Sequence, residues 1–581
     1  MAVMVKKTAR KLGGRGMIGG RGPGGGGDGG DKVTSDLRPS YVPKTPPCIA
    51  TCPNNTDIRG VLTTIAQAEK KEIPRDEAFR RAFEMLVERN PFPASCGRVC
   101  PHPCETACNR GAVDDPVHVN GVERFLGDWG LRTNLAIPLV SGEKHPGKKV
   151  AVIGSGPAGL SCAYQMARRG FPVTVFEAFP RAGGMMRYGI PSYRLPEATL
   201  DAEIARIVGL GVELRVNTIV GQDVAYADLQ KEYAAIFVGI GAHAGKKLGL
   251  PGEESAGNVM TGADFLHRIN SREPVAVGAR VVVVGGGNSA IDAARVSQRL
   301  GAQVVLLYRR TRTEMPAIEE EIREAEAEGI EFVFLAAPRA LLLDGSGNAR
   351  GMACQRMALG EPDASGRRRP VPVEGDTFEL ECTFVIPAIS QEPDFDTLAG
   401  LREGRDWVKV DGRFHVINTE AAVWAGGDDL SLDLVTTAIG HGRRAAVAMA
   451  DALLQKAEPT RFDEDRGPEV KARDNPWFNV AYWEKALRHD TPFIPVEQRF
   501  GEGSMEREVS ATLSEEDALA ECRRCMSCGQ CFQCDNCFKY CQDNAVVKPM
   551  DPQDPYRFKL EYCQGCKKCA ENCPCGYIEL A

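Results

Sequence analysis

Two stretches of the chain share one strand–glycine turn–helix–strand pattern, and their glycines lie 131 residues apart. They read KKVAVIGSGPAGLSCAYQMARRGFPVTVFEA from residue 148 and ARVVVVGGGNSAIDAARVSQRLGAQVVLLYRR from residue 279. Each begins with a short apolar run, passes through closely spaced glycines into a helical segment, and ends in a second apolar run. Such a unit is a parallel βαβ fold whose glycine turn faces the phosphates of a dinucleotide. The repeat therefore predicts an α/β protein with two Rossmann-like domains and two dinucleotide sites.

The first glycine turn has the spacing and context that a dinucleotide requires. Gly154 permits the tight turn, Gly156 lets the backbone approach the pyrophosphate, and Gly159 allows close packing of the helix. The helix begins at Pro157–Ala158, where its N–H groups and positive dipole end favour phosphate. Glu177 closes the next strand and is expected to accept hydrogen bonds from a ribose.

The second turn repeats this order with one change. Gly285, Gly287 and Ala290 take the corresponding positions, and Asn288 begins the helix. Because hydride transfer needs a donor and an acceptor, two unlike nucleotide sites indicate one bound flavin and one exchanging nicotinamide.

The strand end of the second unit distinguishes between the two nicotinamide cofactors. The position that corresponds to Glu177 is Tyr308, and Arg309 and Arg310 follow it. Guanidinium groups pair with a 2′-phosphate, which an acidic residue would repel. The sequence therefore favours NADP(H). If the arginines only form a solvated strand end, the site takes NAD(H).

Several further motifs resemble the small subunit of NADPH-dependent glutamate synthase. They are GSGPAGL, GGMMRYGIPSYRLP (183–196), YRRTRTEMPA (308–317), WAGGDD, AIGHGRRAA (438–446) and CGRVCPHPCETACNRG (96–111), and the similarity covers roughly residues 41–456. Dihydropyrimidine dehydrogenase and the large subunit of the NADH-dependent ferredoxin:NADP oxidoreductase contain related modules. The resemblance implies FAD on the first Rossmann unit and NADP(H) on the second. It adds Gly184, Arg187, Gly427, Asp428 and Ala438 to the cofactor-binding residues, with Asp428 near the ribityl chain or the phosphates.

The same motifs exclude a disulfide reductase of the glutathione or thioredoxin type. Such enzymes need a cysteine pair against the flavin. Neither GGMMRYGIP nor the segment 290–294 contains a cysteine. Electrons are therefore expected to leave the flavin through iron–sulfur clusters.

The C-terminal cysteines form two copies of the bacterial ferredoxin motif, C-x2-C-x2-C-x3-C. In that fold the fourth cysteine of each run binds the other cluster. One predicted cluster takes Cys531, Cys534, Cys537 and Cys573, and the other takes Cys563, Cys566, Cys569 and Cys541. The duplicated spacing disfavours two structural zinc sites.

The N-terminal cysteines are two short of two clusters. In glutamate synthase small subunits two cysteine groups share two clusters, but here the upstream C-x2-C pair is absent. By position, Cys52, Cys96, Cys100 and Cys104 can complete one cluster, and Cys48 and Cys108 supply half of another. We expect Cys525 and Cys528, which follow a helix that Ser514 can cap, to complete it and to give four [4Fe-4S] clusters. The alternative is three clusters and four idle thiols. Cys162, Cys354, Cys382, Cys522 and Cys575 are expected to be packing residues.

These motifs predict an NAD(P)H:acceptor oxidoreductase that passes electrons between NAD(P)H, FAD and the clusters. Because the reaction needs positioning and tuned potentials, no catalytic acid or base is nominated. The redox partner is expected to be a separate protein or complex subunit, such as a dissimilatory sulfite reductase, a 2-oxoacid oxidoreductase or a ferredoxin. A glutamate synthase small subunit proper and a non-catalytic electron-relay subunit are alternatives, and flavin bifurcation stays open.

The motifs divide the chain into six parts. We expect a flexible glycine-rich tail (1–40), a helical iron–sulfur domain (41–140), an FAD domain (141–255 and 386–456), an NAD(P) domain (256–385), a connector (457–520) and an α+β ferredoxin domain (521–581). The net charge of −7 argues against nucleic acid as a partner. No apolar run reaches the ~18 residues of a membrane span, and no signal peptide is recognisable. We expect a cytoplasmic protein, in which such a high number of cysteines (21) indicates metal ligands instead of disulfides.

Overall fold

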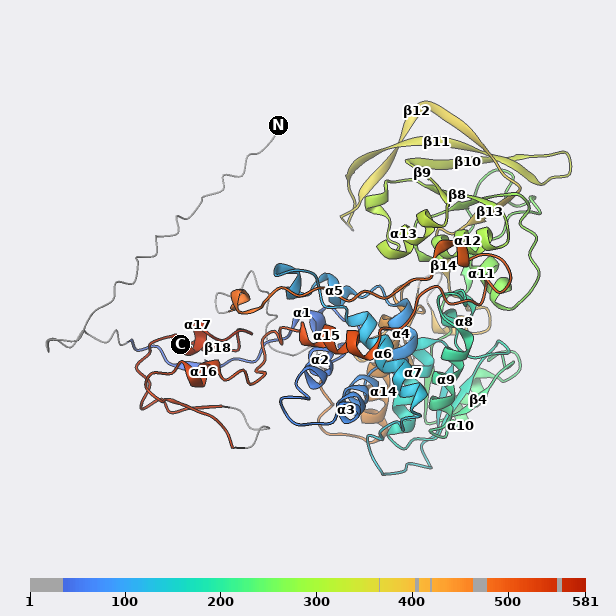
Figure 1. Ribbon diagram of the computed structural model, residues 1–581. Coiled ribbons are helices and arrows are strands. Elements are labelled where there is room, and N and C mark those ends of the chain that lie inside the picture. Colours follow the sequence, from blue (N-terminus) through green and yellow to red (C-terminus); the bar gives the residue numbers. More distant parts are fainter. Residues whose placement is uncertain are drawn as a thin grey trace, which may run out of the picture.

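The computed structural model describes residues 35–364, 366–402, 407–417, 419, 421–462, 478–550 and 556–581 (Figure 1). Two Rossmann-like domains lie at one end, a helical domain lies in the middle, and a small cysteine-rich module lies at the other end. The predicted α/β class is confirmed by two separate parallel sheets.

The first βαβ unit forms the centre of a parallel sheet in the order β15-β5-β2-β3-β4. Every residue of its three central strands is buried, because helices cover a parallel sheet. The strands are β2 (Val150–Ile153), β3 (Val173–Phe176), β4 (Glu213–Arg215), β5 (Ala235–Val238) and β15 (Val423–Ala425). The helices are α7 (Pro157–Arg168), α8 (Met185–Tyr188), α9 (Glu197–Val208), α10 (Tyr226–Glu232) and α14 (Val435–Leu453).

The second unit forms a parallel sheet in the order β13-β7-β8-β9, beside an antiparallel sheet in the order β10-β11-β12. Its parallel strands are β7 (Arg280–Val284), β8 (Gln303–Tyr308), β9 (Glu331–Phe334) and β13 (Phe384–Pro387), and its helices are α11 (Gly262–Asn270), α12 (Asn288–Arg299) and α13 (Glu319–Ala327). The antiparallel strands are β10 (Ala336–Leu343), β11 (Ala349–Pro362) and β12 (Arg368–Glu381). The short strands β6 (Ala244–Gly245) and β14 (Gln391–Glu392) pair where the chain enters and leaves this domain.

The helical domain combines the two ends of the sequence. Its N-terminal helices are α1 (Pro47–Ala50), α2 (Ile58–Ala66), α3 (Arg75–Val87), α4 (Pro93–Val99), α5 (Pro103–Thr106) and α6 (Val119–Arg132). Helix α15 (Glu515–Arg523) packs on α2 and α6 and shares their apolar core through Ala518 and Cys522. As predicted, Ser514 caps α15 by accepting a hydrogen bond from the Asp517 N–H at 3.1 Å.

The C-terminal module (residues 529–581) includes a strand from the start of the described chain. Its elements are α16 (Asn536–Lys539), β16 (Val546–Val547), β17 (Arg557–Phe558), α17 (Lys568–Glu571) and β18 (Ile578–Leu580). Strand β1 (Pro39–Tyr41) pairs antiparallel with β18, and the Tyr41 ring stacks on Tyr577 at 5.0 Å. This differs from the expected boundary at residue 40, because residues 39–41 complete the module instead of ending a tail or beginning the helical domain.

From residue 478 the connector runs across the helical domain to the second Rossmann-like domain and back to α15 (Figure 1). Val509 packs in the core of that Rossmann-like domain, and its N–H donates to the Tyr193 carbonyl at 3.1 Å. Glu508 pairs with Arg98 and Arg124 of the helical domain, at 2.7 Å in each case. The connector therefore ties these two domains together. None of the described helices is long and apolar enough to cross a membrane.

Candidate functional site

A cleft of about 640 Å³ lies between the first glycine turn and the first turn of α12. The predicted residues that line it are Gly154, Gly156, Pro157, Ala158, Glu177, Gly184, Asn288, Gly427, Asp428 and Ala438. The predicted residues outside its lining are Gly159, Arg187, Gly285, Gly287, Ala290, Arg309 and Arg310. The cleft is thus built mainly by the first unit, and the first turn of α12 reaches it from the second.

The first glycine turn has the shape of a phosphate cradle. Gly154 has φ +94°, and a Cβ there would overlap the carbonyl oxygen of Gly239. At Gly156 the nearest atom to an added Cβ would be the Gly184 Cα at 3.9 Å, so this part of the backbone is open to a ligand. The N-terminus of α7 follows directly, and its N–H groups fit the pyrophosphate of a dinucleotide.

Three acidic residues at or beside the cleft accept hydrogen bonds from backbone N–H groups. Glu177 is buried and accepts hydrogen bonds from the N–H groups of Ser155 at 2.9 Å and Phe179 at 2.8 Å. Burial raises the pKa of Asp428 to about 6. The neighbouring Asp429, which sequence reasoning did not nominate, accepts the Gly241 N–H at 2.6 Å. Burial raises the Asp429 pKa to about 8.

Arg187 does not line the cleft. Its guanidinium is buried, donates to the Ala182 carbonyl at 2.5 Å and pairs with Asp201. The Arg187 Nη1 has no hydrogen-bond partner among the described residues, so a cofactor contact through this nitrogen stays a prediction.

The second glycine turn has room for a ligand. No atom lies within 4 Å of a Cβ added at Gly287, so the backbone there is open.

The two arginines that follow β8 lie in different surroundings. Arg309 is exposed at the end of the strand. Arg310 is buried, donates to the Arg368 carbonyl at 2.7 Å and pairs with Asp363 at 2.7 Å. Arg310 therefore fastens the β11–β12 hairpin and is not oriented as a phosphate ligand, which corrects the expectation for this residue.

We expect Arg309→Glu to raise the KM for NADPH by roughly 10- to 100-fold, because a hydrogen bond to a charged group contributes about 1.5–3 kcal/mol. The KM for NADH should change little, since NADH lacks the 2′-phosphate. Steady-state dye reduction with each nucleotide measures both values. Arg310→Gln is the matched variant, and it should lower thermal stability while leaving the ratio of the two KM values unchanged. Equal KM changes for both nucleotides in Arg309→Glu would contradict this assignment.

Four cavities are lined by the predicted cluster cysteines, with the exception of Cys96. The flavin-side cavity is lined by Cys52, Cys100 and Cys104 together with Glu123. Cys96 is not among its lining residues, because its fully buried side chain belongs to the core of the first Rossmann-like domain. The Cys96 Sγ lies 3.7 Å from Asn90 Oδ1.

Glu123, on α6, was missed by sequence reasoning. Its carboxylate accepts a hydrogen bond from Asn90 Nδ2 at 2.8 Å, and burial raises its pKa to about 7. The feature that could have indicated a functional role for Glu123 is its position between Val122 and Arg124, which are both buried. A carboxylate beside three thiols gives this cavity four donor side chains.

The shared cavity is lined by Cys48 and Cys108 from the helical domain and by Cys525 and Cys528 from the segment after α15. The structure thus brings the C-x2-C pair to the two cysteines that lacked partners. Arg59 and Arg110 also line this cavity.

The C-terminal module holds the other two cavities. The third cavity is lined by Cys531, Cys534, Cys537 and Cys573, and the fourth is lined by Cys541, Cys563, Cys566 and Cys569. The crossed pattern of the ferredoxin motif is therefore present. Cys575 is buried in the apolar core of the module, as expected, and also lines the third cavity, with its Sγ 3.8 Å from that of Cys573.

The cleft and the first three cavities have lining residues that are shared or close in sequence. Val99 and Pro101 line the cleft, and Cys100 between them lines the flavin-side cavity. Leu62 and Val119 line both the flavin-side and the shared cavity. Cys528 lines the shared cavity, and Cys531, three residues later in the sequence, lines the third cavity.

Within the described ranges, no three His, Cys, Asp or Glu side chains converge closely enough to hold a single metal ion. The cysteine sets instead line the walls of the four cavities. Thiolates spread around an enclosed volume fit a polynuclear cluster. Cys162, Cys354, Cys382 and Cys522 are buried in apolar cores, away from these cavities.

Comparison with known proteins agrees with this geometry. A family described as pyridine nucleotide-disulphide oxidoreductase matches residues 148–442, and dihydropyrimidine dehydrogenase domain II, 4Fe-4S cluster, matches residues 41–135. The beta subunit of NADP(+)-dependent formate dehydrogenase from Moorella thermoacetica is 41% identical over 510 residues, which cover 83% of this chain and 70% of that protein.

Two further relatives match a shorter part of the chain. The beta subunit of NADPH-Fe(3+) oxidoreductase from Geobacter sulfurreducens is 42% identical over 372 residues, covering 62% of this chain and 54% of that protein. The NADPH glutamate synthase small chain of Escherichia coli is 36% identical over 391 residues, covering 63% and 81%. The match thus spans only about half of the Geobacter subunit. The chain belongs to the pyridine nucleotide-disulphide oxidoreductase family, among the NADPH-dependent iron–sulfur flavoproteins similar to the glutamate synthase small chain.

Proposed function

We propose that this chain is the NADPH-oxidising subunit of a larger redox complex and passes electrons through four [4Fe-4S] clusters to a partner protein. The observation that carries the proposal is the set of four cavities, each lined by at least four donor side chains, of which the flavin-side cavity adjoins the dinucleotide cleft. A bound flavin would supply the conversion between the two-electron hydride of a nicotinamide and the single electrons that clusters carry. The chain's residues bind, orient and enclose these groups.

The partner is expected to carry the terminal chemistry. The Moorella and Geobacter relatives are both named as beta subunits, which supports a subunit role here. The similarity to the Moorella protein favours a formate dehydrogenase-type partner, because that match includes the largest share of this chain among the relatives described. A sulfite reductase, a 2-oxoacid oxidoreductase or a ferredoxin stays a candidate on sequence grounds.

Anaerobic purification followed by iron and flavin analysis tests the proposal. Four clusters require about sixteen iron atoms per chain, whereas the three-cluster alternative requires about twelve. NADPH should bleach the flavin absorbance and produce cluster signals in electron paramagnetic resonance (EPR) spectra. A protein that contains the clusters but is not reduced by NADPH would support the non-catalytic relay instead.

The flavin-side cluster should use Cys52, Cys100, Cys104 and Glu123, so Cys96 should be dispensable. We expect Cys96→Ser to keep its full iron content, because its side chain is buried away from the cavity. Glu123→Ala should lose this cluster or convert it to a three-iron form, and Glu123→Cys should retain four irons with an altered EPR signal, since oxygen and sulfur ligands differ in softness. Loss of about four irons in Cys96→Ser would show that Cys96, and not Glu123, is the fourth ligand of this cluster.

A further inference from the structure

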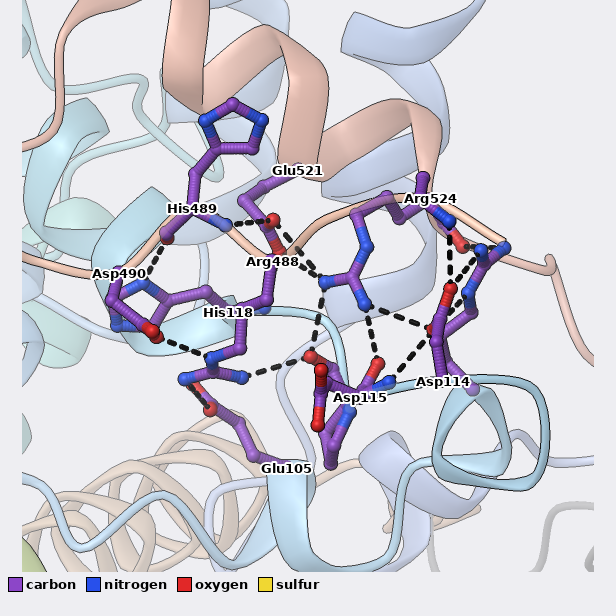
Figure 2. Close-up of polar contacts among 12 residues, drawn as sticks. Glu105, Asp114, Asp115, His118, Arg488, His489, Asp490, Glu521 and Arg524 are labelled. Carbon is purple, nitrogen blue, oxygen red and sulfur yellow. Dashed lines mark hydrogen bonds and ion pairs between the residues drawn. The ribbon is translucent and has the colours of Figure 1, made fainter. Parts of the chain in front are cut away.

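A buried network of ion pairs lies behind the wall of the shared cavity (Figure 2). Arg524, which directly precedes Cys525, places its guanidinium between the carboxylates of Glu521 at 2.8 Å and Asp114 at 3.0 Å. The Arg524 side chain is 3% exposed and that of Glu521 is 0% exposed. Arg110 donates from Nε to the same Asp114 at 2.7 Å and also lines the shared cavity.

Nearly all N–H groups of the Arg524 guanidinium donate hydrogen bonds. Its terminal nitrogens donate to the carbonyls of Pro116 at 3.1 Å and Asp115 at 2.6 Å in addition to the two carboxylates. Of the five N–H groups of a guanidinium, only the buried Nε–H lacks an acceptor among the described residues. Lysine could not reproduce this arrangement, because its ammonium has no planar fork.

The network joins three segments that are far apart in the sequence. Glu521 accepts the backbone N–H groups of His118 and His489, each at 2.7 Å. Arg110 donates to the Glu484 carbonyl at 2.6 Å, which adds the connector. Figure 2 shows these groups converging between the end of α15 and the segment that follows Cys108. The contacts therefore fasten the C-terminal cysteine pair to the N-terminal one.

The network also determines the charge behind the cavity, because Arg524 and Arg110 pair there with the carboxylates of Glu521 and Asp114. Breaking one partner of a buried ion pair leaves an uncompensated charge, whereas breaking an exposed pair has little effect. Without Arg524, the Glu521 and Asp114 carboxylates would remain behind the cavity with less compensation. A negative field there opposes addition of an electron to a cluster.

We propose that Arg524 and Arg110 are positioning residues that hold Cys525 and Cys108 at a common cluster and neutralise the two carboxylates behind it. This rests on the proposed function, in which Cys48, Cys108, Cys525 and Cys528 bind one [4Fe-4S] cluster. The network would then set both the occupancy and the reduction potential of the cluster that links the flavin side to the C-terminal module.

The test uses the full chain, purified anaerobically, as the wild type and as Arg524→Gln, Arg524→Lys and Arg523→Gln. Arg523 is the matched control, since it is 52% exposed and, among the residues that the structure describes, forms its ion pair with the exposed Glu69. Iron and FAD are quantified, and the potential of each cluster is followed by EPR during a redox titration. In Arg524→Gln we expect one cluster signal to shift to lower potential or to disappear with about a quarter of the iron. FAD content and NADPH-driven flavin reduction should stay at the wild-type level.

Arg524→Lys separates charge from geometry. We expect it to return the potential toward the wild-type value while the altered line shape or partial iron loss persists. It also keeps the proposal testable if Arg524→Gln does not fold. Wild-type signals and iron in both Arg524 variants, or equal effects in Arg523→Gln, would overturn the proposal. If the wild type itself contains only three clusters, the proposed function fails first, and the wild-type iron analysis alone reveals this.

Discussion

Replacing Cys525 and Cys528 together by serine should leave NADPH-driven flavin reduction intact and abolish electron delivery to the C-terminal module. The two thiols supply half of the donors of the shared cavity, and a cluster cannot be held by Cys48 and Cys108 alone. The variant should lose about four of sixteen iron atoms, and NADPH should no longer reduce the two C-terminal clusters. Stopped-flow absorbance of the flavin combined with freeze-quench EPR of the clusters measures both halves of this result.

Cys522→Ala is the control for this variant. Cys522 lies three residues before Cys525, but its side chain packs in the apolar core between α15, α2 and α6 and lines none of the cluster cavities described. Its replacement should lower stability slightly and leave iron content and cluster reduction unchanged. An unchanged iron content in the double serine variant would favour the three-cluster alternative.

Gly154→Ala should prevent FAD binding and destabilise the first Rossmann-like domain. The backbone there has φ +94°, and the added Cβ would overlap the Gly239 carbonyl, a backbone atom that cannot rotate away. A substitution at such an incompatible position costs more than about 1 kcal/mol, and the displaced turn also loses its phosphate cradle. FAD content after purification and thermal unfolding, each compared with the wild type, measure the effect.

Gly287→Ala is the contrasting change in the second unit. Gly287 has φ −91°, and no atom lies within 4 Å of an added Cβ, so the protein itself should tolerate alanine. We expect full FAD content and a raised KM for NADPH, because the methyl group would occupy space that the pyrophosphate needs. Loss of FAD from this variant would show that the two turns do not serve separate nucleotides.

The features that could be predicted from the sequence depend on local spacing. The glycines of the two turns determine a strand–turn–helix unit within about 30 residues, and the ferredoxin motif fixes its ligand order in the same way. Ser514 is a cap that can be read directly from its neighbours. The meeting of Cys525 and Cys528 with Cys48 and Cys108 was predicted from a deficit in the cysteine count.

The features that could not be predicted depend on packing between distant segments. Cys96 and Glu123 lie on different helices, and only the packing of α4 into the first Rossmann-like domain decides which of them reaches the flavin-side cavity. Arg309 and Arg310 are the same residue type, so the sequence does not distinguish them. Because side chains alternate along the end of the strand, Arg310 points toward the β11–β12 hairpin. Arg524 looks like part of a short motif, whereas its partners other than Glu521 come from residues about 400 positions away.

The pairing of β1 with β18 has a consequence for the order in which the chain acquires its structure during synthesis. Lys44 donates to the Gly576 carbonyl across 532 residues of sequence. At roughly 5–20 residues per second, the ribosome needs about half a minute to two minutes to make that intervening chain. Both Rossmann-like domains can fold within this delay, while β1 waits for its partner strand. We therefore expect the electron outlet to close last, after the nucleotide sites that feed it have formed.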